Sequence, residues 1–157
     1  MNLYLVQHAK AKGDEEDPQR SLSNEGTAEL RRVVSFVTEQ GCLSVSKILH
    51  SGKLRAEQTA QAFAERLKPS AGLDAADGLK PKDDPSIWAE RLCTVEDDTM
   101  LVGHLPHLGR LASLLLTGDA SRTTVSFRNA GVVALVRDTG GAWTVSWVVT
   151  PQILSGR

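Results

Sequence analysis

Cysteine is scarce in this chain of 157 residues, and long apolar runs are absent. The two cysteines, Cys42 and Cys93, lie far apart, a spacing that favours neither a zinc pair nor a disulfide framework. We expect them to be reduced, structural thiols of a cytoplasmic protein. No apolar run approaches membrane-spanning length, and the first residues lack the basic and apolar segments of a secretion signal. Neither a membrane protein nor a secreted one is therefore predicted.

An excess of either charge is absent as well. The formal net charge is -1 and the basic residues are scattered, so no sequence-independent affinity for nucleic acid is implied. The acidic run Asp14–Asp17 is expected to be a solvated loop, although as an acidic rim it would disfavour strongly anionic small ligands. The length fits one domain with a sizeable core, and we expect residues 1–157 to form that single domain.

Short apolar runs alternate with amphipathic segments along most of the chain. The first run begins at Leu3 and ends just before His8, and its unbroken apolar character is typical of a buried parallel strand. Strands alternate with helices and finish in a hairpin at Gly140-Gly141. This order predicts an α/β fold, a three-layer α/β/α sandwich whose mostly parallel sheet carries a C-terminal antiparallel hairpin. Further strands are expected at Lys47–His50, near Leu73, and at Thr99–Gly103, Ala130–Arg137 and Trp143–Val149, with helices at about 24–40, 54–67, 85–92 and 106–116.

Two helix starts and one strand face can be predicted in more detail. Ser23 is a suitable N-cap for the first helix, and Asp84-Pro85 is a good start for a short one. Trp143 and Trp147 have even spacing, so we expect them to share one strand face as core or helix-covering residues.

Two histidines and an arginine are expected to meet at one edge of the sheet. His8 and His104 each follow an apolar strand, and Arg55 falls in the first turn of the helix that comes after the strand Lys47–His50. In open α/β sheets that carboxyl edge is where ligands bind, and a helix N-terminus suits a phosphate. Because a neutral imidazole can attack phosphorus while arginines bind the oxygens, this set, together with Arg20, predicts phosphoryl-transfer chemistry.

Two other chemistries use residues of these types. A metal site would need carboxylate or cysteine ligands near the same strand ends, and none follows His8 or His104 closely, so no metal is expected. A serine hydrolase is disfavoured because no Gly-x-Ser-x-Gly turn appears.

Four stretches resemble the motifs of the histidine phosphatase, or phosphoglycerate mutase-like, superfamily. Gln7-His8-Ala9 resembles its Arg-His-Gly motif, and Ser51–Thr59 is similar to the motif in which a serine precedes an arginine at a helix start. Val102–Pro106 resembles the segment with the second catalytic histidine, and Asp17–Gly26 the segment that brings in another phosphate-binding arginine. The spacing and small size most resemble the SixA type of phosphohistidine phosphatase, over nearly the whole chain.

The resemblance implies a role for each matching residue. His8 would accept the phosphoryl group as a transient phosphohistidine, and Arg55 and His104 would complete the catalytic set. Water would then release inorganic phosphate, and no cofactor is implied. Substrate-binding roles are implied for Gln7, Arg20 and Ser51.

Gln7 and Ala9 depart from the family's pattern, which has arginine and glycine at these positions. A glutamine donates hydrogen bonds but carries no charge. Losing one charged contact in a dry site costs about 2–4 kcal/mol, or roughly thirty- to a thousand-fold in rate. The departure bears on catalytic efficiency. It leaves open the alternative that the protein is a weakly active module that binds phosphate.

Phosphohistidine is the favoured substrate group. Imidazole, which protonates at about pH 6.5, leaves more readily than an alkoxide and depends less on a positioned acid. No such acid can be identified, since Asp83 is only near in sequence and Asp84 is better explained as a helix cap. No insertion is long enough to cover a small metabolite, so we expect an open site for phosphohistidine on a partner protein. We also expect the protein to be a monomer. A small-metabolite phosphomonoesterase is the alternative.

Overall fold

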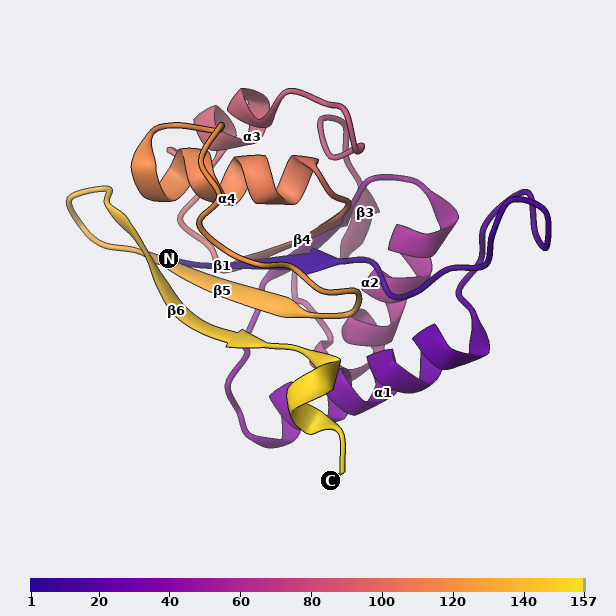
Figure 1. The fold of residues 1–157 in the computed structure, drawn as a ribbon. Helices are drawn as coiled ribbons and strands as arrows, with labels where there is room; N and C mark the ends of the chain where they lie inside the picture. The colour runs from indigo at the N-terminus through magenta and orange to yellow at the C-terminus, as the bar shows by residue number, and fades with distance from the viewer. Residues whose placement is uncertain (157) are drawn as a thin grey trace.

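A six-stranded mixed sheet with helices on both faces forms the molecule, in a computed structural model that describes residues 1–156 (Figure 1). Across the sheet the strand order is β3-β2-β4-β1-β5-β6. The strands are β1 (Asn2–Gln7), β2 (Lys47–His50), β3 (Leu73–Ala75), β4 (Thr99–Gly103), β5 (Val132–Arg137) and β6 (Trp143–Val149). The helices are α1 (Asn24–Glu39), α2 (Leu54–Leu67), α3 (Pro85–Arg91), α4 (His107–Thr117) and the short 3-10 helix η1 (Pro151–Leu154).

The predicted α/β fold is confirmed. Strands β3, β2, β4 and β1 are parallel, while β5 is antiparallel to β1 and β6 is antiparallel to β5. The bounds of β2, β4, β6 and α2 coincide with those expected from the sequence. The 3-10 helix was not expected, because four residues are too few to show a helical period.

Side chains of β1 alternate between two cores on opposite faces of the sheet. Tyr4 and Val6 belong to the core that α1 and α2 cover, whereas Leu3 and Leu5 belong to the core that α3 and α4 cover. A central strand buried on both faces needs apolar residues at successive positions, which explains the unbroken run in the sequence. The helices contribute Leu30 and Phe63 to the first core and Trp88 and Leu111 to the second.

Both predicted helix starts are confirmed. The hydroxyl of Ser23 accepts a hydrogen bond from the backbone N–H of Gly26 at 3.0 Å, and the carboxylate of Asp84 accepts one from the N–H of Ser86 at 2.9 Å. Helix α1 also approaches the loop after β1 very closely, since a Cβ at position 26 would lie 2.1 Å from the carbonyl oxygen of Lys10. Only glycine fits at that position without a shift of the backbone.

Trp143 and Trp147 lie on opposite faces of the sheet, so the expectation that they share a face is wrong. Trp147 packs against the core under α1 and α2, and Trp143 packs against the core under α3 and α4. The cause is a β-bulge, because the neighbours Ala134 and Leu135 of β5 pair with Trp147 and Val145. The extra residue in β6 reverses the alternation of its side chains. Both tryptophans still cover the core, as expected.

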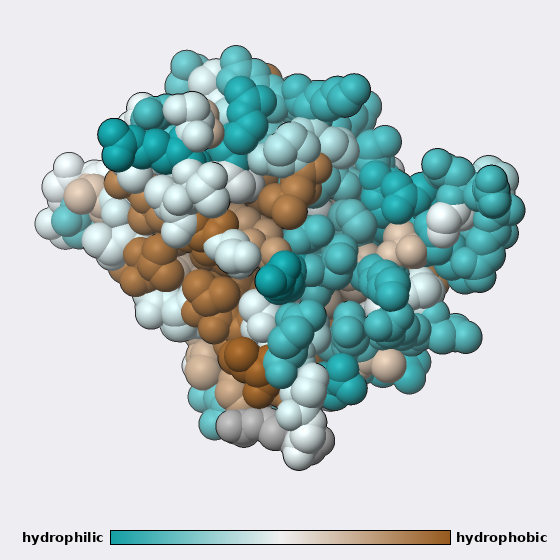
Figure 2. All heavy atoms as spheres, in the orientation of Figure 1, coloured by the Kyte–Doolittle hydropathy of each residue, from teal (hydrophilic) through white to brown (hydrophobic). Residues whose placement is uncertain are grey.

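The surface corrects one further expectation. Cys42 and Cys93 are free thiols, but both are exposed, so neither has the structural role that the sequence suggested. Apolar side chains gather instead over β6 and the 3-10 helix (Figure 2), where Val145 and Ile153 are exposed. Among residues 1–156, no helix is long and apolar enough to cross a membrane.

Candidate active site

Three neighbouring parallel strands end at the residues selected from the sequence. His8 follows β1, His104 follows β4 and Ser51 follows β2, and these strands are adjacent in the order β2-β4-β1. The imidazole rings of His8 and His104 are consequently close together and tilted, with centroids 5.0 Å apart and an interplanar angle of 52°. The carboxyl edge of the sheet therefore brings both histidines and the serine together.

The backbone around His8 is fixed by hydrogen bonds from three separate parts of the chain. The N–H of His8 donates to the carbonyl oxygen of Gly103 at 3.0 Å, and the amide of Asn129 donates to the carbonyl oxygen of His8 at 2.8 Å. The N–H of Ala9 donates to the buried hydroxyl of Thr59 at 2.9 Å. These contacts hold the residue after β1 at a defined position relative to α2, β4 and β5.

The imidazole of His8 is set up as a neutral base. Its Nδ1 lies 2.7 Å from the carbonyl oxygen of Ala9, which can only accept a hydrogen bond, so Nδ1 carries the proton and Nε2 keeps its lone pair. Burial lowers the pKa of His8 to about 4; the Ala9 carbonyl opposes the shift, and the charges of Arg55 and Arg20 contribute to it. At neutral pH this ring is a neutral imidazole.

The ring of His104 is held by Ser51. The hydroxyl of Ser51 lies 2.6 Å from Nε2 of His104 and also accepts a hydrogen bond from the N–H of Lys53 at 3.3 Å. Burial, followed by the charges of His8, Arg55 and Lys53, lowers the pKa of His104 to about 3. His104 is thus a second neutral imidazole, and its buried Nδ1 has no hydrogen-bond partner in the described part of the chain.

Arg20 and Arg55 line an open hollow, and the charges of both act on His8. Arg55 lies in the first turn of α2, and its Nε is buried without a partner among residues 1–156. Burial lowers the pKa of Arg55, and the nearby charge of Arg20 adds to the effect. Arg20 enters from the loop after β1 with a φ of 52°, and its Nε donates to the carbonyl oxygen of Lys12 at 3.1 Å. The hollow has a volume of about 420 Å³ and is lined by Asp14, Pro18, Gln19, Arg20, Lys53, Leu54 and Arg55.

Gln7 is the last residue of β1 and lies directly before the nucleophile candidate. Its position in the sheet is opposite Gly103, on the strand that leads to His104. The side-chain oxygen Oε1 is buried, and no hydrogen-bond partner for it exists in the described residues. Gln7 therefore brings an amide, and no charge, to the edge where the two histidines meet.

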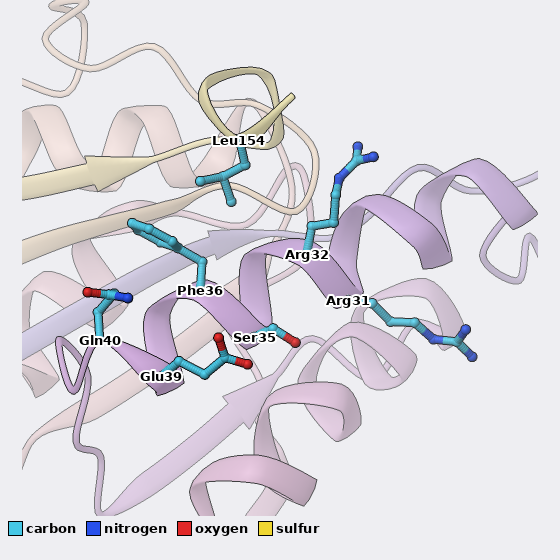
Figure 3. Close-up of a pocket in the computed structure, with 7 residues that line it drawn as sticks. All are labelled: Arg31, Arg32, Ser35, Phe36, Glu39, Gln40 and Leu154. Atoms are coloured by element: carbon cyan, nitrogen blue, oxygen red, sulfur yellow. The ribbon is translucent and has the colours of Figure 1, made fainter. Parts of the chain in front are cut away.

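A comparable hollow elsewhere holds none of the selected residues. It has a volume of about 450 Å³ and lies between α1 and the 3-10 helix (Figure 3). Arg31 and Arg32 extend there away from Phe36 and Leu154. The arrangement suited to phosphoryl chemistry is the one at His8, where the charges of Arg20 and Arg55 act on an imidazole with a lone pair on Nε2.

Sequence reasoning did not select three residues that the structure brings into this site. Thr59 lies inside the motif that begins at Ser51, and its hydroxyl donates to the carbonyl oxygen of Arg55 at 2.7 Å while it accepts from Ala9. Lys53 lies in the same motif and lines the hollow. Asn129 had no local signal, because it meets His8 only through the fold, 121 positions along the chain.

Known proteins provide an independent comparison. No family model matches the sequence. Over 156 residues the chain is 24% identical to the phosphohistidine phosphatase SixA of Escherichia coli (strain K12), covering 96% of this chain and 94% of that protein. A solved structure of the protein histidine phosphatase SixA complexed with tungstate superposes with a TM-score of 0.85 at 23% identity, over 99% of this chain and 100% of the other.

A more distant structure has the same fold. The alpha-ribazole phosphatase from Shigella flexneri superposes with a TM-score of 0.78 at 12% identity, over 96% of this chain and 97% of that one. The similarity to SixA extends over nearly the full length in both sequence and structure. The chain therefore has the histidine phosphatase fold, and it is similar to SixA over nearly its full length.

Proposed function

We propose that the protein is a phosphatase that removes the phosphoryl group from phosphohistidine on a partner protein. The observation that carries the proposal is the tautomer of His8, whose Nδ1–H is fixed on the Ala9 carbonyl so that Nε2 is free to attack phosphorus. Similarity to the SixA structure that holds tungstate supports a site for a phosphate-like oxyanion in this chain.

In the first step Nε2 of His8 attacks phosphorus, and the P–N bond of the substrate breaks. The departing imidazole takes a proton from water, and the phosphoryl group is now bonded to Nε2 of His8. Arg20 and Arg55 bind the non-bridging oxygens, because forked guanidinium donors match phosphate geometry. Gln7 adds a neutral hydrogen-bond donor. The ring of His104, which Ser51 orients, lies 5.0 Å from the ring of His8 between centroids and stabilises the transition state.

In the second step water attacks phosphorus and the bond to Nε2 breaks. Inorganic phosphate leaves, and His8 returns to its neutral form. Neither step requires a strong acid, which agrees with the hydrogen bonds that Asp83 and Asp84 already make. Asp84 is engaged as the N-cap of α3, and Asp83 accepts a hydrogen bond from the N–H of Lys80 at 2.9 Å. This supports an imidazole leaving group over the alkoxide of a sugar phosphate.

The test is a turnover panel. A histidine-phosphorylated phosphotransfer protein is compared with sugar, nucleotide and aryl phosphates at equal concentration. We expect the phosphohistidine protein to have the highest kcat/KM, and brief incubation to trap an acid-labile phosphoenzyme.

His8→Ala is expected to abolish both turnover and the trapped phosphoenzyme and to leave the fold intact, since His8 is half-buried beyond the end of β1. Preference for a sugar phosphate would favour the metabolite phosphomonoesterase. Phosphate binding without a phosphoenzyme would favour the inactive binding module.

A further inference from the structure

Lys53 is a third cation in the lining of the hollow. It precedes the first residue of α2, its side chain is half-buried, and it lines the hollow together with Arg20 and Arg55. Its hydrogen bonds are made by the backbone alone: the N–H donates to Ser51, and the carbonyl oxygen accepts from the first turn of α2. In the described part of the chain the ammonium group forms no ion pair.

The acidic residue in the lining is already associated with another cation. Asp14 lies 3.8 Å from Nε of Arg20, and the remaining lining residues are Pro18, Gln19 and Leu54. Lys53 is also close enough to His104 for its charge to act on that ring. Lys53 also lies only two residues after Ser51, whose hydroxyl contacts the ring of His104.

The site has one positive charge fewer than the family's pattern at position 7. Gln7 contributes an amide where the family's motif has a guanidinium, and its buried oxygen lacks a donor among residues 1–156. Lys53 contributes a charge from the turn between β2 and α2. A lysine suits this task because its flexible stem carries a compact charge with three donors.

We propose that Lys53 binds the phosphoryl oxygens of the substrate and supplies the positive charge that Gln7 withholds. This inference rests on the proposed function and makes it more specific. Arg20, Arg55 and Lys53 together present three cationic side chains to a phosphoryl group, the number the site would have with arginine at position 7 and no lysine at position 53.

The test measures phosphate binding separately from turnover. Inorganic phosphate is titrated into the wild-type protein and into Lys53→Met by calorimetry, and kcat/KM is measured with phosphoramidate. Because a hydrogen bond to a charged group is lost, we expect the Kd for phosphate to rise roughly 10- to 100-fold and kcat/KM to fall by a similar factor. Lys53→Arg should recover most of both quantities.

Lys68→Met is the matched control. It removes the same charge from the other end of α2, at the C-cap and outside the hollow, and should leave both quantities unchanged. A double-mutant cycle adds a second readout: Gln7→Arg should improve phosphate binding more in the Lys53→Met background than in the wild type, because each cation substitutes for the other.

The outcomes separate this inference from the proposed function. If Lys53→Met binds phosphate as tightly as the wild type while a phosphoenzyme still forms on His8, the role of Lys53 is refuted and the phosphatase proposal stands. If no phosphoenzyme forms but Lys53→Met still weakens phosphate binding, the catalytic proposal fails and the binding role of Lys53 is supported. Equal gains from Gln7→Arg in both backgrounds would also overturn the inference.

Discussion

Acidification provides a direct test of how His8 is kept nucleophilic. Burial lowers its pKa from 6.5 to about 4. At pH 5 a group with a pKa of about 4 is about nine-tenths neutral, whereas an ordinary histidine is only about 3% neutral, a difference of roughly 30-fold in available nucleophile. We therefore expect the protein to form its phosphoenzyme at pH 5 at nearly the rate seen at pH 7.

The assay is an NMR titration of the imidazole C–H signals between about pH 3.5 and 8. The chain has four histidines, and the spectrum of His8→Ala assigns the signal of His8. A midpoint close to 4 is expected, without added phosphate, whose negative charge would raise it. A midpoint near the unperturbed value of about 6.5 would refute the reasoning, because the ring would then be protonated in mildly acidic solution.

The free energy of unfolding should also depend on pH, because His8 has different pKa values in the folded and unfolded chain. Between about pH 4 and pH 6.5 the unfolded chain binds a proton at position 8 that the folded protein does not. The free energy of unfolding should therefore rise as the pH rises through this window. A shift of this size in one group corresponds to about 3 kcal/mol, which is an upper value for a half-buried ring. His8→Ala should show a flatter pH dependence in urea denaturation.

Two further substitutions test the contacts that hold the site. Ser51→Ala removes the 2.6 Å contact to Nε2 of His104 and should lower kcat/KM by about 10-fold with little change in Tm, as measured by steady-state kinetics and thermal unfolding; an unchanged kcat/KM would contradict the positioning role of Ser51. Thr59→Val leaves the N–H of Ala9 without an acceptor and should cost about 1–3 kcal/mol in urea denaturation. Its control is Thr38→Val, because the hydroxyl of Thr38 only donates within α1, to the carbonyl oxygen four residues earlier at 2.8 Å. Equal losses of unfolding free energy in the two variants would contradict the argument.

Most of the fold was predictable because local chemistry and tertiary structure agree. The apolar runs of β2 and β4 are bounded by polar or turn residues, and the helix starts carry the caps that their sequences suggest. The bulge in β6 was not predictable, because the choice of which residue is skipped depends on pairing with β5. The even spacing of Trp143 and Trp147 therefore predicted wrongly that they share a face of the sheet. The prediction that both cover the core was correct.

The candidate site was predictable to the extent that its residues follow strands. His8 and His104 come directly after apolar runs, so their convergence follows from the parallel order of β1 and β4. Asn129 was not predictable, because its partner is a backbone carbonyl that the sequence does not mark. Lys53 was overlooked because a lone lysine before a helix has no distinctive pattern, and only the shared hollow relates it to Arg55.

The backbone of Arg20 shows how this chain balances folding against chemistry. Its φ of 52° lies in the left-handed region, which costs a residue with a Cβ about 1–3 kcal/mol and a glycine almost nothing. Under the proposed function Arg20 binds phosphoryl oxygens, so glycine at this position would relieve the backbone but remove a cation from the hollow. A library screened only for heat resistance would therefore erode the site while improving the stability of the protein.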